Sequence, residues 1–455
     1  MPMATISPPL PRLEAAPGPV GLVNGLRNLR AFQRDILGFL GHLARKYGDF
    51  VQFDFGPFRT YFANHPDLLH QILVEEAAKY YKTSLTKTLL QPFLGEGLLV
   101  NDGEPWKRQR KLIQPAFHAA RVAAYADTMV AYAQRAVAEW QPGQMRWIDH
   151  DMMTLTLDIV IKTLFGEQLT PQEREAVGQA VDIGQKQVGD GFKTLFRMPD
   201  WVPTPARRRG EWATRVINDV IARFIAHYRQ TRHDRGDLLA MMLAAVDEDG
   251  GMSDAQARDE AFTLIVAGHE TTANTLTWAW YLLSQHPQAE AALHAELDRV
   301  LGGRAPTFAD LPALTFTEAI IKETLRLYPA AYIVAREPQE DVCVGRYAVL
   351  RGRPILIAPY ITHRDPRWFD EPNAFKPERW LGDLEKSLPK LAYLPFGGGP
   401  RICIGNAFAM MEARLILATV AQRFRLSLAP GQRVEVEPLV TLRPRHGMPM
   451  VVHVR

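Results

Sequence analysis

Residues 396–405 read Phe396-Gly397-Gly398-Gly399-Pro400-Arg401-Ile402-Cys403-Ile404-Gly405, and a helix-type run from Asn406 to Phe424 follows at once. A phosphate-binding loop would place Gly-Lys-Ser/Thr at the start of the helix. A lipase-type oxyanion loop would need a histidine before the glycines and a G-x-S-x-G motif elsewhere, and both patterns are missing. A cysteine at a helix N-terminus gains amide donors and the positive end of the helix dipole, which lowers the pKa of its thiol. The stretch predicts a metal-binding thiolate at Cys403, with glycines that let a large flat group approach the backbone.

The composition is that of a folded protein without a global charge preference. The chain has 455 residues, 47% hydrophobic and 23% charged, which excludes disordered, collagen-like and coiled-coil chains. With 53 Lys and Arg against 50 Asp and Glu, the net charge is only +3, and nothing demands a nucleic-acid or membrane partner. Two cysteines exclude a disulfide scaffold. We interpret Cys343, in Asp341-Val342-Cys343-Val344, as an ordinary buried residue.

The N-terminus predicts an extended arm. Six prolines among the first 20 residues disfavour helix, so we assign residues 1–30 to a Pro-rich arm on the domain surface. No basic segment precedes an apolar stretch there, and no run of about 18 apolar residues occurs, which argues against a signal peptide and a membrane span. A cytoplasmic protein is the expectation. The scarcity of acids in residues 1–33 leaves an organellar transit peptide as a second interpretation.

Beyond residue 30 the pattern is mostly α with small β-sheets. Low-proline helical stretches occupy residues 31–47, 103–139, 148–185, 208–230, 253–285, 315–328 and 405–425. Strand-type runs occupy 49–54, 342–358 and 435–454. Without an internal repeat or a Gly/Ser linker, residues 31–455 are expected to form a single domain.

The clearest element is a helix from Ser253 to about Gln285. Ser253 and Gln256 have capping-box spacing, and Pro287 follows the far end. In the middle lies Ala267-Gly268-His269-Glu270-Thr271-Thr272, where a glycine and two threonines invite a local kink or bulge. Ala273 stands where the second histidine of a zinc motif would be needed, so this segment is not H-E-x-x-H. Taken alone, it also fits a buried helix that tolerates polar residues.

Five motifs in order resemble the cytochrome P-450 monooxygenases, and together they cover nearly the whole chain. Residues 396–405 resemble the family's haem-binding signature, Glu323-Thr324-Leu325-Arg326 its E-x-x-R helix, and residues 375–380 (Phe-Lys-Pro-Glu-Arg-Trp) its meander motif. Residues 267–272 resemble its oxygen-activating helix, and residues 106–110 (Trp-Lys-Arg-Gln-Arg) its W-x-x-x-R element. The resemblance implies the P-450 fold of a soluble, bacterial-type member, with haem between a long central helix and the cysteine loop.

The resemblance also implies the cofactor and the residues that hold it. Haem b, iron protoporphyrin IX, would be bound non-covalently with Cys403 as the axial thiolate, because Ala267 stands where one branch of the family has an ester-linked glutamate. The other expected haem contacts are Phe396, Arg401, Gly405, Trp106, Arg110, Arg336, Ala267 and Gly268. Glu323, Arg326 and Arg379 would form a structural triad that braces the segment leading to Cys403.

Thr271 and Glu270 are the expected catalytic residues. A hydroxyl beside a carboxylate is a plausible relay for the protons that O2 cleavage consumes. Family members that use H2O2 directly generally lack this pair, which favours O2 with external electrons. An H2O2-driven peroxygenase and a non-catalytic haem or gas sensor are the alternatives.

The substrate and the electron donor follow by analogy. The proposed substrate-facing residues are apolar and imply a hydrophobic small molecule; they are Leu89, Leu90, Phe93, Leu98, Phe262, Thr263, Val266, Ala331, Ile333, Val334 and Val440. No flavin or NAD fingerprint is present, so NAD(P)H would act only indirectly, through a ferredoxin or flavodoxin with its reductase. Lys107, Arg108 and Lys111 could offer that acidic partner a positive face. The protein is expected to be a monomer.

Overall fold

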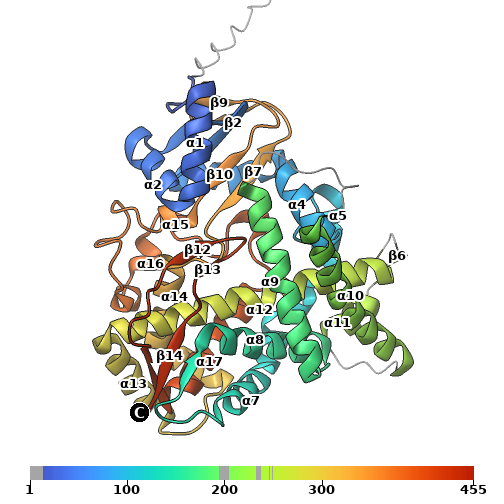
Figure 1. Cartoon of the computed structure of the whole chain (residues 1–455), viewed down its shortest axis with the longest axis vertical. Coiled ribbons are helices and arrows are strands. Elements are labelled where there is room, and N and C mark those ends of the chain that lie inside the picture. The colour runs from blue at the N-terminus through green and yellow to red at the C-terminus, as the bar shows by residue number, and fades with distance from the viewer. Residues whose placement is uncertain (1–13, 194–203, 232–236, 245, 248–249) are drawn as a thin grey trace, which may run out of the picture.

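The computed structural model describes residues 14–193, 204–231, 237–244, 246–247 and 250–455. Helices dominate it, and small sheets lie at its margins (Figure 1). The helices before the chain midpoint are α1 (Leu22–Arg34), α2 (Ile36–Tyr47), α3 (Pro66–His70), α4 (Ser84–Leu94), α5 (Gly103–Ile113), α6 (Ala119–Ala124), α7 (Ala126–Val137), α8 (Ile148–Phe165), α9 (Pro171–Lys193) and α10 (Pro205–Thr231). They are followed by α11 (Leu238–Ala244), α12 (Asp254–Gln285), α13 (Pro287–Leu301), α14 (Thr315–Leu327), α15 (Pro359–Thr362), α16 (Leu384–Ser387) and α17 (Asn406–Ala421). The predicted fold class is confirmed.

The largest sheet joins segments that are remote in sequence. Its order is β1 (Phe50–Phe55), β2 (Phe58–Ala63), β10 (Ile355–Ile357), β7 (Val334–Pro338) and β3 (Tyr80–Tyr81). A second sheet has the order β11 (Phe424–Leu428), β14 (Pro449–Val454), β4 (Met145–Trp147). The remaining strands form two-stranded ribbons: β12 (Val436–Pro438) with β13 (Leu442–Pro444), β8 (Val342–Val344) with β9 (Tyr347–Val349), and β5 (Val246–Asp247) with β6 (Gly250–Gly251).

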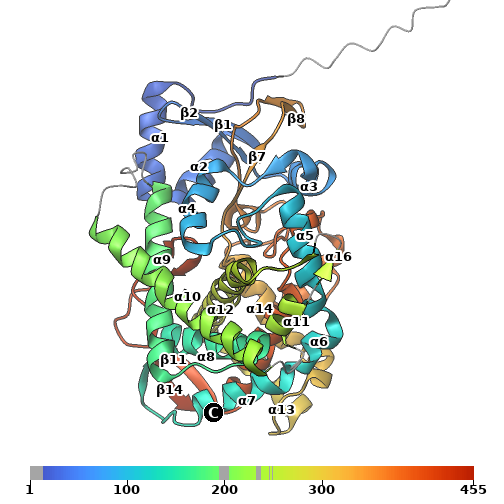
Figure 2. The same ribbon diagram turned by 90° about the vertical axis from the view of Figure 1, so that its right-hand side faces the viewer.

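Helix α12 crosses the middle of the molecule, and Figure 2 looks nearly along it. The predicted cap is confirmed, because the Ser253 side chain accepts a hydrogen bond from the Gln256 N–H. The predicted bulge is wrong, and the predicted kink stays a prediction. The helix is α-helical without interruption from Asp254 to Gln285, and the Thr271 and Thr272 hydroxyls donate back to the carbonyls of Ala267 and Gly268.

The C-terminal segment closes over α12. The indole N–H of Trp278 donates to the Leu442 carbonyl (3.0 Å), and the Tyr332 hydroxyl donates to the Leu439 carbonyl (2.8 Å). The Leu442 N–H donates to the Ala330 carbonyl (3.0 Å). The chain beyond Leu439 is therefore tied to the central helix and to the segment that follows α14.

Two predictions at the edges of the domain are corrected. The arm was expected to reach residue 30, but α1 begins at Leu22, because the prolines end at Pro19 and helix-compatible residues follow. Residues 14–21 do run along β1, where the Gln52 N–H bonds the Pro17 carbonyl (2.9 Å); residues 1–13 lie outside the described part. Cys343 is exposed rather than buried, because Val342 and Val344 take the inward positions of β8.

Candidate haem-thiolate site

The cysteine loop is fixed by its own backbone and by a neighbouring helical turn. The Cys403 N–H donates to the Phe396 carbonyl (2.9 Å), which closes the loop just before α17. Gly399 has a φ of 65°, and a Cβ there would lie 1.8 Å from the Leu73 carbonyl oxygen. Glycine at this position is therefore required for packing against the protein itself, a role that the sequence argument did not foresee.

The pKa of the Cys403 thiol shifts in the opposite direction to the lowering that the sequence predicts. Burial raises the pKa of this thiol, and the Gly405 N–H and the charge of Arg110 only partly offset it. Yet Cys403 has substantial solvent-accessible surface, and so has Ala267, whose neighbours from Ala261 to Val266 on α12 are all buried. Accessible surface so deep in the molecule indicates interior space beside the thiol and beside the middle of α12.

That space is where the implied haem would lie, and the donor set fits it. Within the described residues, no group of three His, Cys, Asp or Glu side chains could hold a metal ion. A single thiol suits a macrocycle that brings its own nitrogen ligands to the iron. Cys403 would supply the axial thiolate, with Phe396 and Gly405 beside it and Ala267 and Gly268 on the opposite side.

The cations around the loop fit the two carboxylates of such a group. Burial, followed by the charge of Arg401, lowers the pKa of Lys82 to about 7 and that of Arg336 to about 10. Burial also lowers the pKa of Arg401 and of Arg110. In the described part of the chain, none of Lys82, Arg110 and Arg336 forms an ion pair with a carboxylate. An excess of partly buried positive charge of this kind is stabilised by anionic groups.

The one carboxylate among these cations is already engaged. Asp102 binds Arg401, forms an ion pair with Lys87 (2.9 Å) and accepts the backbone N–H of Lys82 (3.1 Å). Lys82 was missed by the sequence argument because no motif marks it. Only its depth and the neighbouring arginines identify it.

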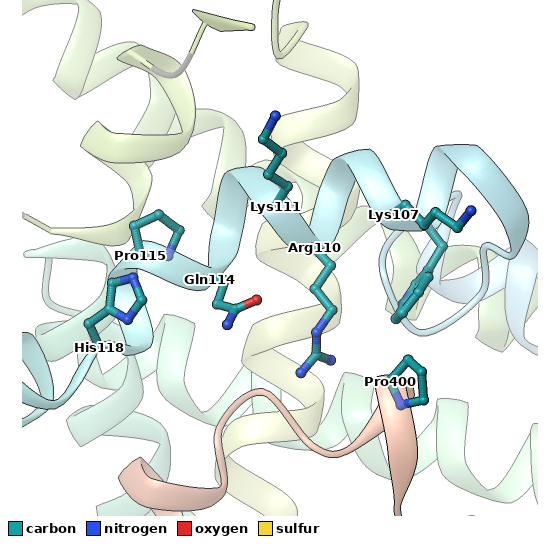
Figure 3. A pocket seen from close by; sticks show the side chains of 8 residues that line it. Lys107, Arg110, Lys111, Gln114, Pro115, His118 and Pro400 are labelled. Atoms are coloured by element: carbon teal, nitrogen blue, oxygen red, sulfur yellow. The ribbon is translucent and has the colours of Figure 1, made fainter. Parts of the chain in front are cut away.

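Helix α5 links the loop to the protein surface. The Trp106 ring lies under the Arg401 guanidinium (4.2 Å), and Arg110 donates to the Ile402 carbonyl (2.9 Å). These residues border a surface hollow of about 460 Å³, and Figure 3 shows Arg110 reaching from α5 toward the loop that carries Pro400. Lys107 and Lys111 line the same hollow, and Lys107 also pairs with Glu104 (2.6 Å).

The predicted catalytic pair is adjacent in sequence but does not share a hydrogen bond among the described residues. Thr271 is partly accessible and donates to the Ala267 carbonyl (2.8 Å). Glu270 is buried and faces away, toward α9 and the C-terminal segment, where it accepts from the Thr441 hydroxyl (2.5 Å) and from the Gln185 amide. Successive side chains on a helix point about 100° apart, which accounts for the separation.

Glu270 is held in a polar cage that the sequence argument missed. Asn274 donates to the Thr441 hydroxyl oxygen (3.1 Å), which orients the hydroxyl toward the Glu270 carboxyl group. Burial raises the pKa of Glu270 to about 7, against the opposing effects of Thr441 and the Arg443 charge. Arg443 in turn binds Asp182 (2.9 Å). Gln185, Thr441 and Arg443 are all remote in sequence from Glu270 and belong to no motif.

The side chains of the predicted triad are in contact; Glu323 and Arg326 are fully buried, and Arg379 lies at the rim. Arg326 binds both oxygens of Glu323 (2.8 Å each), and Arg379 binds one of them (3.1 Å). Arg326 also donates to the carbonyls of His363, Pro372 and Ala374, and the His363 ring accepts the Leu394 N–H (2.8 Å) just before the cysteine loop. These contacts agree with a bracing role.

The proposed substrate-facing residues fall into two groups. Phe93 and Phe262 meet edge to face at 4.9 Å, and Thr263 is covered by Gly97, where a Cβ would lie 2.2 Å from its hydroxyl. Leu90, Leu98, Phe262, Thr263 and Val266 are buried, whereas Leu89, Phe93 and Val440 are half-buried. The second group flanks a single hydrogen bond, in which Tyr332, between Ala331 and Ile333, donates its hydroxyl to the carbonyl of Leu439, the neighbour of Val440. Val334 begins β7.

A thiol just before α17, a long central helix and half-buried cations fit a haem-thiolate protein. The sequence profile described as Cytochrome P450 matches residues 17–448, and the chain belongs to the cytochrome P450 family. It is a P450 monooxygenase, with iron protoporphyrin IX as cofactor and electrons supplied by a redox partner. None of the described helices is both long and apolar enough to cross a membrane.

Several bacterial proteins resemble this chain over most of its length. Cyclooctatin synthase of Streptomyces melanosporofaciens is 39% identical, over 90% of this chain and 89% of its own. Cyclooctat-9-en-7-ol 5-monooxygenase of the same organism is 36% identical, over 91% and 90%. Pentalenene oxygenase of Streptomyces avermitilis is 34% identical, over 94% of each chain.

Proposed function

We propose that this P450 inserts one oxygen atom from O2 into a cyclic terpenoid, using electrons from a separate ferredoxin or flavodoxin. The use of O2 is supported by two neighbouring side chains at the centre of α12: the buried Glu270 carboxyl group, which Gln185 and Thr441 hydrogen-bond, and the accessible Thr271 hydroxyl. The substrate class is supported by the names of relatives similar over nine-tenths of the chain. Apolar residues near the site suit such a molecule. A monomeric, cytoplasmic protein remains our prediction.

Each part of the site then has a defined task. When bound, haem with a thiolate ligand supplies the activation of O2. Thr271 is partly accessible and its hydroxyl can pass a proton toward the reacting oxygen. Glu270, with its pKa raised to about 7, can both hold and release a proton near neutral pH. Lys82, Arg336 and Arg401 would hold the two carboxylates of the cofactor.

Electron delivery would use the face around the hollow at α5. Lys107 and Lys111 border it, Arg108 lies on the same helix, and Pro400 belongs to the cysteine loop. An acidic partner docked there would lie against the cysteine loop, which shortens the path for electrons. Complementary charge would speed its association.

The test is turnover of pentalenene and cyclooctat-9-en-7-ol under labelled O2, with NADPH, a surrogate ferredoxin and its reductase. We expect one labelled oxygen atom in each product molecule. Turnover with H2O2 but none with the reductase system would identify a peroxygenase instead. If neither terpenoid is turned over but an unrelated hydrophobic compound is, the terpenoid assignment is wrong. The proposed use of O2 would then still hold.

Replacing Thr271 by alanine is expected to uncouple electron use from oxygen insertion. Product formed per NADPH should fall about tenfold or more, with release of H2O2, because the proton donor is lost. Haem binding should persist, since the Thr271 side chain bonds only the Ala267 carbonyl. Thr277→Ala is the matched control, because that hydroxyl makes the same kind of bond six residues further along α12, to the Ala273 carbonyl (2.8 Å). Equal coupling in the two variants would contradict the relay.

Replacing Thr441 by valine is expected to move the pH dependence of coupling upward. The Thr441 hydroxyl stabilises the ionised form of Glu270, so its loss raises the pKa of that carboxyl above about 7. A hydrogen bond to a charged group contributes about 1.5–3 kcal/mol, which corresponds to a shift of about 1–2 pH units. The measurement is product formed per NADPH against pH. Thr441→Ser should restore the original midpoint, and an unchanged midpoint in Thr441→Val would refute the assignment of Glu270.

A further inference from the structure

The loop between α4 and α5 is hydrogen-bonded to the N-terminal third of α12. The Glu96 N–H donates to a carboxylate oxygen of Asp259 (2.9 Å), and the Leu98 N–H donates to Oε2 of Glu260 (2.9 Å). We define the α4–α5 loop as residues 95–102, which lie between the end of α4 and the start of α5. Two acidic side chains of the central helix therefore hold two backbone amides of this loop.

The α4–α5 loop is braced internally and by α5. The N–H groups of Val100 (2.9 Å) and Asn101 (3.1 Å) both donate to the Gly97 carbonyl. The side-chain amides of Asn101 and Gln109 both donate to the Glu96 carbonyl (2.7 Å each). Because these bonds connect its two ends, we expect the loop to move as one unit. What fixes it on α12 also fixes its far end.

The far end of the loop meets the cations around the cysteine loop. The Asn101 carbonyl accepts hydrogen bonds from the Lys82 ammonium group (3.1 Å) and from Arg401 (3.1 Å). The next residue, Asp102, also binds Arg401 and accepts the Lys82 backbone N–H (3.1 Å). The α4–α5 loop therefore connects α12 with two cations that the proposed function assigns to the haem carboxylates.

Glu260 is a buried acid to which neither a motif nor the proposed proton relay assigns a task. It is 0% exposed, and its Oε1 atom has no hydrogen-bond partner among the described residues. Burial raises the pKa of Glu260 to about 8, against the opposing effect of the Leu98 N–H, and the charge of Asp259 adds to the rise. Burying an acid with an unpaired oxygen is costly. The hydrogen bond to the α4–α5 loop indicates what this acid does in return.

We propose that Glu260 is a positioning residue that seats the α4–α5 loop on α12 and thereby sets the cations at the far end of the loop. It acts through the loop rather than on the reacting atoms. Leu98, a predicted substrate-facing residue, is held by the same bond. The inference rests on the proposed function where that function assigns Lys82 and Arg401 to the haem carboxylates, and it is independent of the terpenoid substrate.

The proton on Glu260 provides a readout that an uncharged structural contact would not give. With the loop seated, the pKa of Glu260 is about 8, whereas a lifted loop would let water return it toward the ordinary value of 4.5. The seated state then binds more protons, so raising the pH from about 5 to about 8 weakens seating about tenfold per pH unit, and the effect levels off above that. Asp259 with its partner Arg258 on α12, and Glu96 on the loop, are the other charged residues at this contact.

Seating is tested by hydrogen exchange of the full-length holoprotein, followed by mass spectrometry on peptides that cover residues 95–101. After correction for intrinsic exchange, protection should fall about tenfold for each pH unit between about pH 6 and pH 8. Glu260→Gln keeps an acceptor for the Leu98 N–H but cannot ionise, so it should retain its full protection across this range. A flat profile in the unchanged protein, or an unchanged slope in Glu260→Gln, would overturn the proposal.

The link to the cofactor is tested by the rate at which the holoprotein releases haem to apomyoglobin. Glu260→Met removes the acceptor of the Leu98 N–H and should release haem about tenfold faster, the effect of about one lost hydrogen bond. Glu260→Gln should restore the original rate. Lys82→Met should also accelerate release, and an unchanged rate there would reject the assignment of Lys82 to the haem carboxylates without affecting the seating of the loop.

Glu296→Met is the matched control for loss of a buried glutamate. The Glu296 carboxylate is also buried and accepts the backbone N–H groups of Phe316 (2.6 Å) and Thr317 (2.8 Å). This variant should lose folding stability but keep the rate of haem release and the protection of residues 95–101. Equal haem release from Glu260→Met and Glu296→Met would overturn the proposal. If Glu260→Met does not accumulate as folded holoprotein, Glu260→Asp, whose carboxyl group is one methylene shorter, takes its place.

Discussion

Replacing Cys403 by alanine is expected to abolish the thiolate-type absorption of the reduced carbon monoxide complex and all monooxygenase turnover. The described residues offer no second metal-binding cluster that could take the place of the lost thiolate. Protein folding should persist, because the loop is held by the Cys403 backbone N–H and by Gly399 against Leu73, and neither contact uses the thiol. Near-unchanged far-ultraviolet circular dichroism with loss of the thiolate spectrum is the expected result.

The chain supplies its own matched control for this experiment. Cys343 is the second of two cysteines and is exposed on β8. Cys343→Ala should therefore leave the spectrum and the turnover unchanged. Retention of the thiolate spectrum in Cys403→Ala, or its loss in Cys343→Ala, would show that Cys403 is not the thiolate ligand.

Replacing Glu323 by glutamine is expected to produce the largest loss of stability among single charge removals. Five donors converge on its two oxygens: Nε and Nη2 of Arg326, Nε of Arg379, the indole N–H of Trp380 and the backbone N–H of Lys376. Arg326 is fully buried, so neutralising Glu323 leaves a buried guanidinium without its counter-charge. Breaking a buried pair in this way costs about 3–5 kcal/mol.

Urea unfolding followed by circular dichroism measures this cost. Glu385→Gln is the matched control, because Glu385 pairs with Lys322 (2.6 Å) at the surface and should lose less than about 1 kcal/mol. If Glu323→Gln does not accumulate as folded protein, Arg379→Gln at the rim of the network should show an intermediate loss. If Glu323→Gln lowers the free energy of unfolding no more than Glu385→Gln does, the bracing role is contradicted.

The sequence predicts long elements well where local signals are strong. Residues 253–285 carry a cap, a helical pattern and a following proline, and the helix occupies Asp254–Gln285. The low-proline stretch 103–139 is helical as predicted and is divided among α5, α6 and α7, with Pro115 in the first break. The strand β2 was missed because its last four residues are all buried, between β1 and β10, so its sequence lacks the alternation of a half-exposed strand.

The candidate site also contains residues that local sequence signals reveal and residues that they do not. Motifs predict residues whose type the cofactor would constrain, such as Cys403 and Arg401. They are silent about Lys82 and Thr441, whose importance depends on burial and on neighbours distant in sequence. Cys343 shows the converse error, since a residue type that is often buried stands on the outer side of a short edge ribbon.

The closure of the C-terminal segment over α12 has a consequence for how the protein is made. Glu270 is anchored by Thr441, 171 residues later, and Trp278 bonds the Leu442 carbonyl. During synthesis the central helix leaves the ribosome long before these partners exist. Until then Glu270 has no hydroxyl to bind and the indole N–H of Trp278 has no acceptor. Glu270, the proposed catalytic acid, therefore acquires its setting only when nearly all of the chain has emerged, and nascent chains ending before Leu439 should not yet have formed the proposed proton relay.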